Sequence, residues 1–293
     1  MEITGRVVRR GVKERLEFID FRLFWEGRIN RADIMDRFAI STPQASKDLS
    51  LYESIAQGNL FYDVSAKRYL ASPSFTPRFI EPNADGFLIQ LRNIADHTLP
   101  VEDTWLGLAP SAEAMPIPSR RVSVPVLRAV LKAIEKRTAV RVLYQSMNEQ
   151  RPGPMWRWLV PHALAHDSLR WHVRAFCEET KIFKDFLLSR CVDIGEERTT
   201  EIKASQDKYW NEHFSVVLVP NPVLSSEQQE VVAQDYCMEY GQIAVPVRKA
   251  LLYYFNKRLR LDVAKEKDLT KETPVVVLND RAFQDVLAEM DRH

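Results

Sequence analysis

Cysteine and glycine are both scarce in this sequence, with three cysteines and nine glycines among 293 residues. Cys177, Cys191 and Cys237 are odd in number and show no C-x-x-C spacing. This pattern excludes a disulfide framework and a cysteine-based zinc site as the basis of the fold. We therefore expect reduced thiols in a cytoplasmic protein.

The sequence also lacks the motifs of common enzyme classes. No glycine lies in a G-x-G-x-x-G or G-x-x-x-x-G-K-[ST] pattern, and G-x-S-x-G and H-E-x-x-H are absent. No cofactor, metal ion or catalytic residue is therefore predicted, and we do not expect an enzyme.

Long apolar runs are missing as well. A membrane-spanning helix needs about 20 consecutive apolar residues. No stretch of the chain approaches that length, and residues 1–18 contain no apolar segment typical of a signal peptide. The formal net charge is only +1, so any basic surface must be local. We expect a cytoplasmic protein without a membrane partner.

The length of the chain and its proline-rich segments indicate several small domains. Prolines and serines gather at residues 72–77, and three prolines lie within residues 109–119. We divide the chain into a DNA-binding domain at 1–71, a helical connector at 72–122, a sensor domain at 123–195 and a C-terminal extension at 203–293. The connector contains one predicted helix, residues 85–97.

Residues 1–71 predict a winged helix-turn-helix. Apolar spacing gives helices at 13–25, 31–38 and from 41 or 42 to about 55. Asn30 is placed to cap the second helix, and Pro43 is tolerated in the first turn of the third. Residues 60–63 and 67–70 then form a two-stranded wing. Two short helices joined by a tight turn are typical of DNA-binding proteins, although similar triplets also serve as protein interaction modules.

The third helix is predicted to contact DNA through its polar face. Ala45 and Leu49 face inward, which leaves polar side chains outward that can pair with bases or phosphates. The predicted DNA-binding residues are Thr42, Gln44, Ser46, Lys47 and Ser50 on the helix, with Lys67 and Arg68 on the wing.

Residues 139–193 predict a small antiparallel sheet or barrel. Apolar and polar residues alternate in four runs, at 140–146, 156–162, 169–177 and 183–190, after a predicted helix at 126–137. In the third run, Val173 and Ala175 share one face, and His172 and Arg174 share the other. We therefore predict a four-stranded sheet with one polar face.

That sheet carries an unusual set of polar and aromatic side chains. Arginine guanidinium groups and hydroxyl groups can hydrogen-bond an anion, and aromatic rings can stack on a planar ligand. The predicted ligand-binding residues are Tyr144, Ser146, His162, Trp171, His172, Arg174 and Arg190. The structural alternative is that Arg174 or Arg190 pairs with Asp185 or Asp193.

A metal site and a catalytic pair are two further interpretations of these residues. His162 and His166, with His172 or Cys177, have the residue types of a zinc site. However, Asp167 marks a turn at that point, which makes the required geometry unfavourable. His162 and His172 as an acid–base pair would lack an accompanying carboxylate cluster for magnesium.

The same stretch resembles the WYL domain of bacterial transcription factors. The resemblance rests on Tyr144-Gln145-Ser146, Pro161-His162-Ala163-Leu164, Trp171-His172-Val173-Arg174-Ala175 and Leu188-Ser189-Arg190. The name-giving Trp-Tyr-Leu is here Trp171-His172-Val173, which departs at two positions. The resemblance implies an Sm-like β-barrel that senses ligands, often nucleic acid or nucleotides. The nearest relatives it suggests are the phage-defence-associated repressors of BrxR and CapW type.

Residues 203–293 alternate between predicted strands and helices, which indicates a small α/β extension. The strands are predicted at 215–220, 243–247 and 273–278, and the helices at 225–236, 248–256 and 281–290. In WYL regulators such an extension contributes to dimerisation.

Together these observations predict an α+β multidomain protein that acts as a homodimeric repressor. Its partners would be double-stranded DNA with a pseudo-palindromic operator and an anionic effector such as a nucleotide or nucleic acid. Two alternatives remain: an enzyme that processes nucleic acid, and an RNA-binding adaptor that uses the Sm-like barrel alone.

Overall fold

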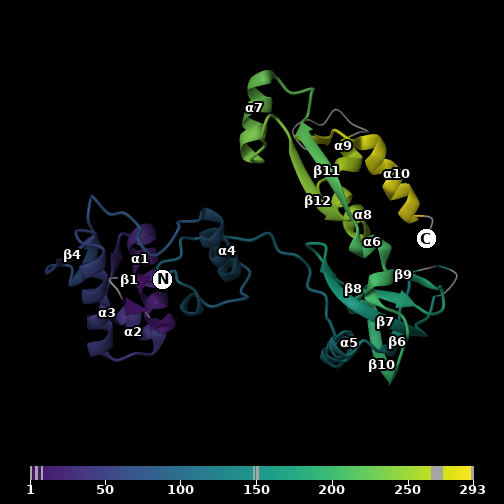
Figure 1. The fold of residues 1–293 in the computed structure, drawn as a ribbon, viewed down its shortest axis with the longest axis horizontal. Coiled ribbons are helices and arrows are strands. Elements are labelled where there is room, and N and C mark those ends of the chain that lie inside the picture. Colours follow the sequence, from purple (N-terminus) through teal and green to yellow (C-terminus); the bar gives the residue numbers. More distant parts are fainter. Residues whose placement is uncertain are drawn as a thin grey trace. The chain divides into compact units, whose positions relative to one another are not determined.

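Figure 1 shows the computed structural model of the chain, which divides into two compact units, Met1–Ile117 and Pro118–His293. The structure describes residues 2–3, 6–7, 9–147, 149, 152–264 and 273–291. Within these ranges, no helix combines the length and the apolar character needed to cross a membrane.

Three helices form the centre of the first unit. They are α1 (Arg10–Glu26), α2 (Arg31–Phe38) and α3 (Thr42–Ile55), and a short pair, β1 (Glu2–Ile3) and β2 (Arg6–Val7), precedes them. Gly27 ends α1 in the left-handed conformation, at φ 68°. Asn30 caps α2 by accepting the backbone N–H of Asp33, whose carboxylate accepts the N–H of Asn30 in return. The predicted helix-turn-helix is therefore confirmed.

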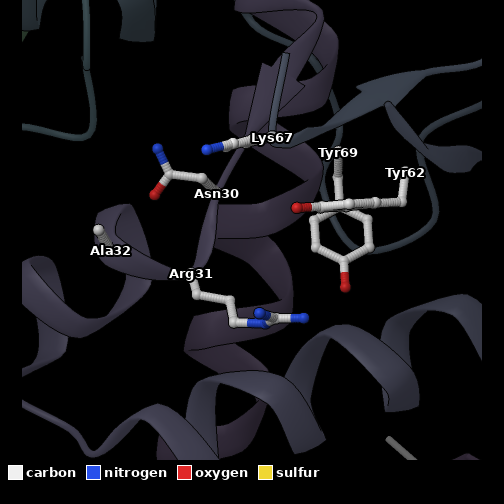
Figure 2. Close-up of a pocket in the computed structure, with 6 residues that line it drawn as sticks. All are labelled: Asn30, Arg31, Ala32, Tyr62, Lys67 and Tyr69. Carbon is white, nitrogen blue, oxygen red and sulfur yellow. The ribbon is translucent and has the colours of Figure 1, made fainter. Parts of the chain in front are cut away.

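Three short strands form the wing beside the helices. The wing contains β3 (Arg28–Ile29), β4 (Leu60–Asp63) and β5 (Arg68–Ala71) in the order β3-β5-β4. Because β3 directly precedes α2, the wing lies beside the start of that helix, where Figure 2 shows Tyr62, Lys67 and Tyr69 close to Asn30 and Arg31. The predicted hairpin is confirmed, and the short strand β3 adds to it.

The segment after the wing packs against the helices instead of standing apart from them. It includes α4 (Ala84–Ala95) and η1 (Val101–Asp103). The buried carboxylate of Asp20 accepts the backbone N–H groups of Arg78 and Phe79, both at 2.7 Å, and also the hydroxyl of Tyr52. Trp105 packs edge-on against Phe18, with ring centroids 6.0 Å apart. The connector thus belongs to the first unit as far as residue 117.

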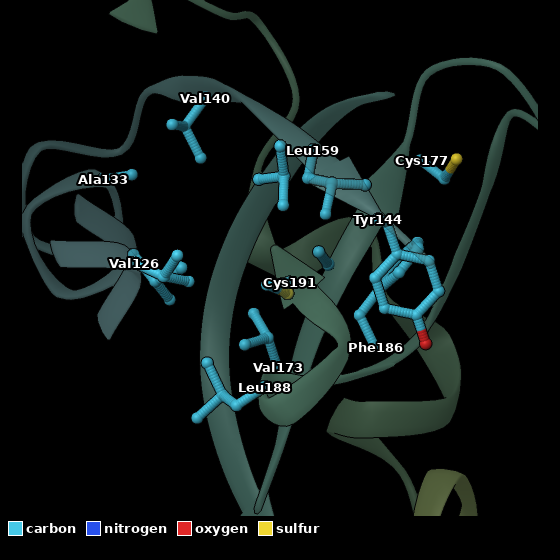
Figure 3. Packing of buried hydrophobic residues seen from close by; sticks show 13 residues of the cluster. Val126, Ala133, Val140, Tyr144, Leu159, Val173, Cys177, Phe186, Leu188 and Cys191 are labelled. Carbon is cyan, nitrogen blue, oxygen red and sulfur yellow. The ribbon is translucent and has the colours of Figure 1, made fainter. Parts of the chain in front are cut away.

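The second unit begins with a helix and a five-stranded antiparallel sheet. The elements are α5 (Val124–Lys136), β6 (Ala139–Tyr144), β7 (Met155–His166), β8 (Trp171–Cys177), β9 (Ile182–Leu187), η2 (Leu188–Arg190) and β10 (Cys191–Arg198). Their order is β10-β6-β7-β8-β9. Figure 3 shows Val126 of α5 in the same apolar cluster as Val140, Leu159 and Val173 of the sheet. The helix therefore covers one face of the sheet and leaves the other face to different contacts.

The prediction of four strands is wrong in two places. A fifth strand, β10, lies beyond the four predicted runs, and residues 188–190, predicted as the end of the fourth run, form a 3₁₀ turn. Strand β10 lies at an edge and has two register shifts, so its alternation is interrupted and most of its side chains are exposed. Among the described strand pairs, none joins β9 to β10, so these two strands form the edges of the sheet.

The C-terminal part contains a second antiparallel sheet. Its elements are η3 (Ala204–Gln206), α6 (Lys208–Asn211), β11 (His213–Pro220), α7 (Ser226–Asp235), β12 (Ile243–Arg248), η4 (Lys249–Leu251), α8 (Leu252–Arg258), α9 (Leu261–Ala264), β13 (Val275–Val277) and α10 (Asp280–Asp291). The strand order is β12-β11-β13. Val216 and Leu218 of β11 pack with Leu252 and Phe283 in its core. The predicted strands and helices are all present, within a few residues of the predicted bounds.

Candidate functional site

The outward face of α3 is polar, as predicted. Thr42, Lys47 and Ser50 are exposed, and Ser46 is half-buried. The opposite face is fixed by the buried residues Ala45, Leu49 and Tyr52. The helix therefore presents short hydroxyl side chains and one cation from a rigid support.

Gln44 has a local partner that the sequence did not reveal. Its amide Nε2 donates to Asp48 Oδ1 at 3.0 Å. Asp48 is buried and also accepts Arg15 Nε at 2.6 Å. A glutamine amide has two N–H groups and one carbonyl oxygen, so the bond to Asp48 orients Gln44 and leaves one donor and one acceptor for DNA.

The wing places two cations differently. Lys67 is exposed at the turn between β4 and β5, with a left-handed backbone at φ 52°. Arg68 is half-buried, and its Nε donates to the carbonyl oxygen of Ala66 at 3.2 Å. Lys67 is thus open to a partner, whereas part of the guanidinium of Arg68 is engaged by its own turn.

A notch of about 270 Å³ lies between the wing and the start of α2 (Figure 2). Its lining includes the cations Arg31 and Lys67, the amide of Asn30 and the two tyrosines Tyr62 and Tyr69. Among the described residues, neither Arg31 nor Lys67 has a side-chain partner. Sequence analysis missed Arg31, because it follows a capping residue and looks like an ordinary first residue of a helix.

Arg174 lies on the face of the second unit's sheet that α5 does not cover. The side chain is only 5% exposed. Its Nε and Nη2 donate to the two carboxylate oxygens of Asp207, at 2.7 and 3.0 Å, and its Nη1 donates to Asp185 at 3.3 Å. His162 adds a bond from Nε2 to Asp207 Oδ2 at 3.0 Å. Asp207 therefore binds both His162 and Arg174, which lie on the neighbouring strands β7 and β8.

The charges in this cluster stabilise one another. Burial alone would raise the pKa of Asp207, but the hydrogen bonds from His162 and Arg174 outweigh it and lower that pKa to about 2. Burial likewise opposes the charge of Arg174, yet the contacts with Asp207 and Asp185 raise its pKa. Asp207 is consequently ionised at neutral pH and paired with a buried cation.

His172 extends the cluster toward the C-terminal part of the unit. Its Nε2 donates to Asp167 Oδ2 at 2.9 Å, and its ring lies 4.7 Å from that of Tyr254. The hydroxyl of Tyr254 donates to Asp185 Oδ2 at 3.2 Å.

We call the six residues His162, His172, Arg174, Asp185, Asp207 and Tyr254 the junction network. It joins β7, β8 and β9 to α8 and to the residue that precedes α6.

The remaining predicted ligand-binding residues lie elsewhere. Tyr144 belongs to the core beneath α5, where burial raises its pKa while the neighbouring Arg190 guanidinium counteracts that effect. Ser146 follows Gln145, whose backbone N–H donates to the carbonyl oxygen of Arg190 at 3.0 Å. Trp171 is half exposed, and its ring packs at a tilt against that of His166, with centroids 4.7 Å apart. The structure thus brings Tyr144 to Arg190, and His162 to Arg174, but not all seven residues to one another.

The partners in the junction network carried no clear sequence signal. Asp207 lies ahead of the first predicted strand of the C-terminal extension, and Tyr254 lies on the helix predicted at 248–256. The structural alternative for Arg174, a contact with Asp185, is present in the structure. In the described ranges, no group of three His, Cys, Asp or Glu side chains is placed to hold a metal ion.

Three family models match separate parts of the chain. Residues 11–93 match the BrxR transcriptional regulator winged helix-turn-helix domain, and residues 125–194 match the WYL domain. Residues 213–283 match the BrxR transcriptional regulator C-terminal dimerization domain. The order of the three matches follows the order of domains in the fold.

Several proteins are similar to this chain over most of its length. A DNA-binding transcriptional repressor CapW of Stenotrophomonas maltophilia is 40% identical over 95% of this chain and 93% of its own. The protein of the same name from Pseudomonas aeruginosa is 38% identical over 92% and 88%, and that of Escherichia coli 39% over 86% and 84%.

One solved structure aligns with nearly the whole chain. It is the proteasome accessory factor B/C (PafBC) of Arthrobacter aurescens, which aligns with 98% of this chain at 16% identity. The chain spans 50% of that protein's length, and the TM-score of 0.26 supports no conclusion.

Proposed function

The chain belongs to the BrxR-type WYL-domain transcriptional regulators, and we propose that it is a homodimeric DNA-binding repressor that responds to an anionic effector. The observation that carries the proposal is similarity to CapW repressors across all three domains, together with an exposed polar face on α3. The family comprises transcriptional regulators, so we propose neither a processing enzyme nor an RNA-binding adaptor.

DNA binding is assigned to α3 and the wing. Thr42, Gln44, Ser46, Lys47 and Ser50 would lie in the major groove, where glutamine can pair with adenine and lysine with guanine or phosphate. The phosphate backbone would contact Lys67, Arg68 and the notch beside Arg31. The notch has a suitable chemistry because it is lined by two tyrosines and by two cations that have no side-chain partner among the residues that the structure describes.

Dimerisation sets the form of the operator. Two subunits related by two-fold symmetry would place their α3 helices in successive major grooves, about 34 Å apart, on a pseudo-palindromic site. We propose that this site lies upstream of the protein's own operon, that the operon serves phage defence, and that the protein acts in the cytoplasm where this DNA lies.

The effector is proposed to act through the second unit. The predicted set Tyr144, Ser146, His162, Trp171, His172, Arg174 and Arg190 supplies the cations and aromatic rings for it. His162, His172 and Arg174 are held by carboxylates in this conformation, so an effector would reach them by competing with those partners or by acting beside them. To change DNA binding, it must bind two conformations of the dimer unequally.

Substitutions on α3 test the assignment of the recognition helix. Gln44→Ala and Lys47→Ala should together abolish specific binding to the upstream DNA while leaving the dimer intact, because neither side chain belongs to the buried core of the first unit. A mobility-shift titration measures binding, and sedimentation measures the dimer. Glu53→Gln, on the same helix and exposed, is the control. Unchanged affinity in the double variant would refute this recognition helix.

A further inference from the structure

A groove of about 440 Å³ lies beside strand β7, between the end of α5 and residues 200–205. Its apolar surface comes from Ile134, Val160 and Ile202. Sites for small molecules commonly have volumes of about 300–1,000 Å³ and combine an apolar lining with a few polar groups. The size and lining of this groove therefore suit a small organic molecule.

The charge of the groove is positive. Arg137, at the end of α5, and Lys203, ahead of η3, both line it and are exposed. In the described part of the chain, neither side chain takes part in an ion pair, and no carboxylate lines the groove. Two cations that share one concave surface without a counter-charge are stabilised by a bound anion.

His162 connects the groove to the junction network. Its side chain lines the groove yet is only 9% exposed, and its Nε2 is committed to Asp207. The other ring nitrogen, Nδ1, makes no hydrogen bond to any described residue. Because Nε2 donates to Asp207, Nδ1 of the neutral ring can accept a hydrogen bond from a donor on a molecule in the groove. Trp210, which follows Asp207 and donates its N–H to it, packs edge-on against the same ring at 5.8 Å.

We propose that this groove binds a small organic anion, a phosphate or carboxylate on a planar apolar body, which pairs with Arg137 and Lys203 and contacts His162. The occupant and Asp207 then share one imidazole ring, so binding alters the junction network. The link to repression rests on the proposed function, but binding of the anion does not.

Isothermal titration calorimetry of the full-length protein without DNA tests the site. The probes are adenosine 5′-monophosphate and benzoate, with uncharged adenosine as the comparison. Saturable binding of either anion, but not of adenosine, is expected, and the anion that binds distinguishes phosphate from carboxylate. Binding of neither anion, or equal binding of adenosine, overturns the proposal.

Two variants locate the binding. The double variant Arg137→Ala with Lys203→Ala should lower the affinity for the anion by roughly tenfold or more, as expected for lost charge-assisted hydrogen bonds. Arg128→Ala, an exposed arginine on α5 that does not line the groove, should leave it unchanged. Equal affinity in the double variant and the wild type would place the anion elsewhere and overturn the assignment.

Amide hydrogen exchange tests the connection to the network. The anion should change exchange in the peptide that contains Trp210, whose N–H is bound to Asp207, in the wild type but not in the double variant. Bound anion with unaltered exchange there would overturn the coupling. DNA binding is measured separately, so a failure of this site and a failure of the repressor function are distinguishable.

Discussion

Replacing Asp207 with asparagine should destabilise the second unit. The change keeps the side-chain volume but removes the charge that holds both Arg174 and His162. The buried guanidinium would keep only Asp185, at 3.3 Å. Removing one partner of a buried ion pair costs about 3–5 kcal/mol, and because Asp185 remains we expect about 3 kcal/mol.

A double-mutant cycle separates the pair from its surroundings. The cycle compares Arg174→Met, Asp207→Leu and the two combined, all of which leave Asp185 in place. The double variant leaves neither Arg174 nor Asp207 without its partner, and replacing a buried pair by apolar residues of similar volume is often near neutral. We therefore expect the double variant to be more stable than either single variant. Urea unfolding followed by tryptophan fluorescence measures this, because Trp210 packs on His162 within the same cluster.

Glu201→Gln is the control for this experiment. Glu201 is exposed in the same segment and has no ion-pair partner among the described residues, so its loss should change stability by less than about 0.5 kcal/mol. The reasoning is refuted if Asp207→Asn is as stable as this control, or if the double variant is less stable than both single variants.

Three further predictions concern pH, the first unit and the wing. The pKa of Asp207 is lowered to about 2, so its contribution to the free energy of unfolding is complete above the unfolded pKa of about 4 and is lost as the pH falls toward 2. Urea unfolding should therefore show a larger difference in stability between the wild type and Asp207→Asn at pH 5 than at pH 3. Tyr52→Phe removes a buried hydroxyl bonded to Asp20 and should cost about 2 kcal/mol, visible as a lower midpoint of thermal unfolding; an unchanged midpoint would contradict this role. Arg31→Ala with Lys67→Ala should reduce the slope of log affinity against log salt by about one to two units and weaken specific and nonspecific DNA alike; loss of specific binding only would contradict a phosphate contact.

The parts of the fold that the sequence predicts are those with local signals. Helix α2 is predicted to the residue, because Asn30 caps it through contacts within a single turn. In β8, alternation correctly separates Val173 and Ala175 from His172 and Arg174. Such signals depend on neighbours in the chain, which the sequence displays directly.

The parts that escape prediction depend on distant partners. Strand β10 was missed because an edge strand with two register shifts loses its alternation. Asp207 pairs with Arg174 across 33 residues, and no periodicity marks an aspartate in a polar segment as the partner of a buried arginine. The polar face of the sheet was predicted, with Asp185 as a possible partner of Arg174, but Asp207 was not.

A hydroxyl-radical footprint of the DNA upstream of the gene tests the central claim most directly. A dimer that places two α3 helices in successive major grooves should protect two tracts on one face of the duplex, with centres about 10 base pairs or a multiple apart. The same pattern should be absent from a scrambled duplex at equal salt. Uniform protection of both duplexes, or no protection at protein concentrations where the dimer is intact, would contradict the assignment as a sequence-specific dimeric repressor.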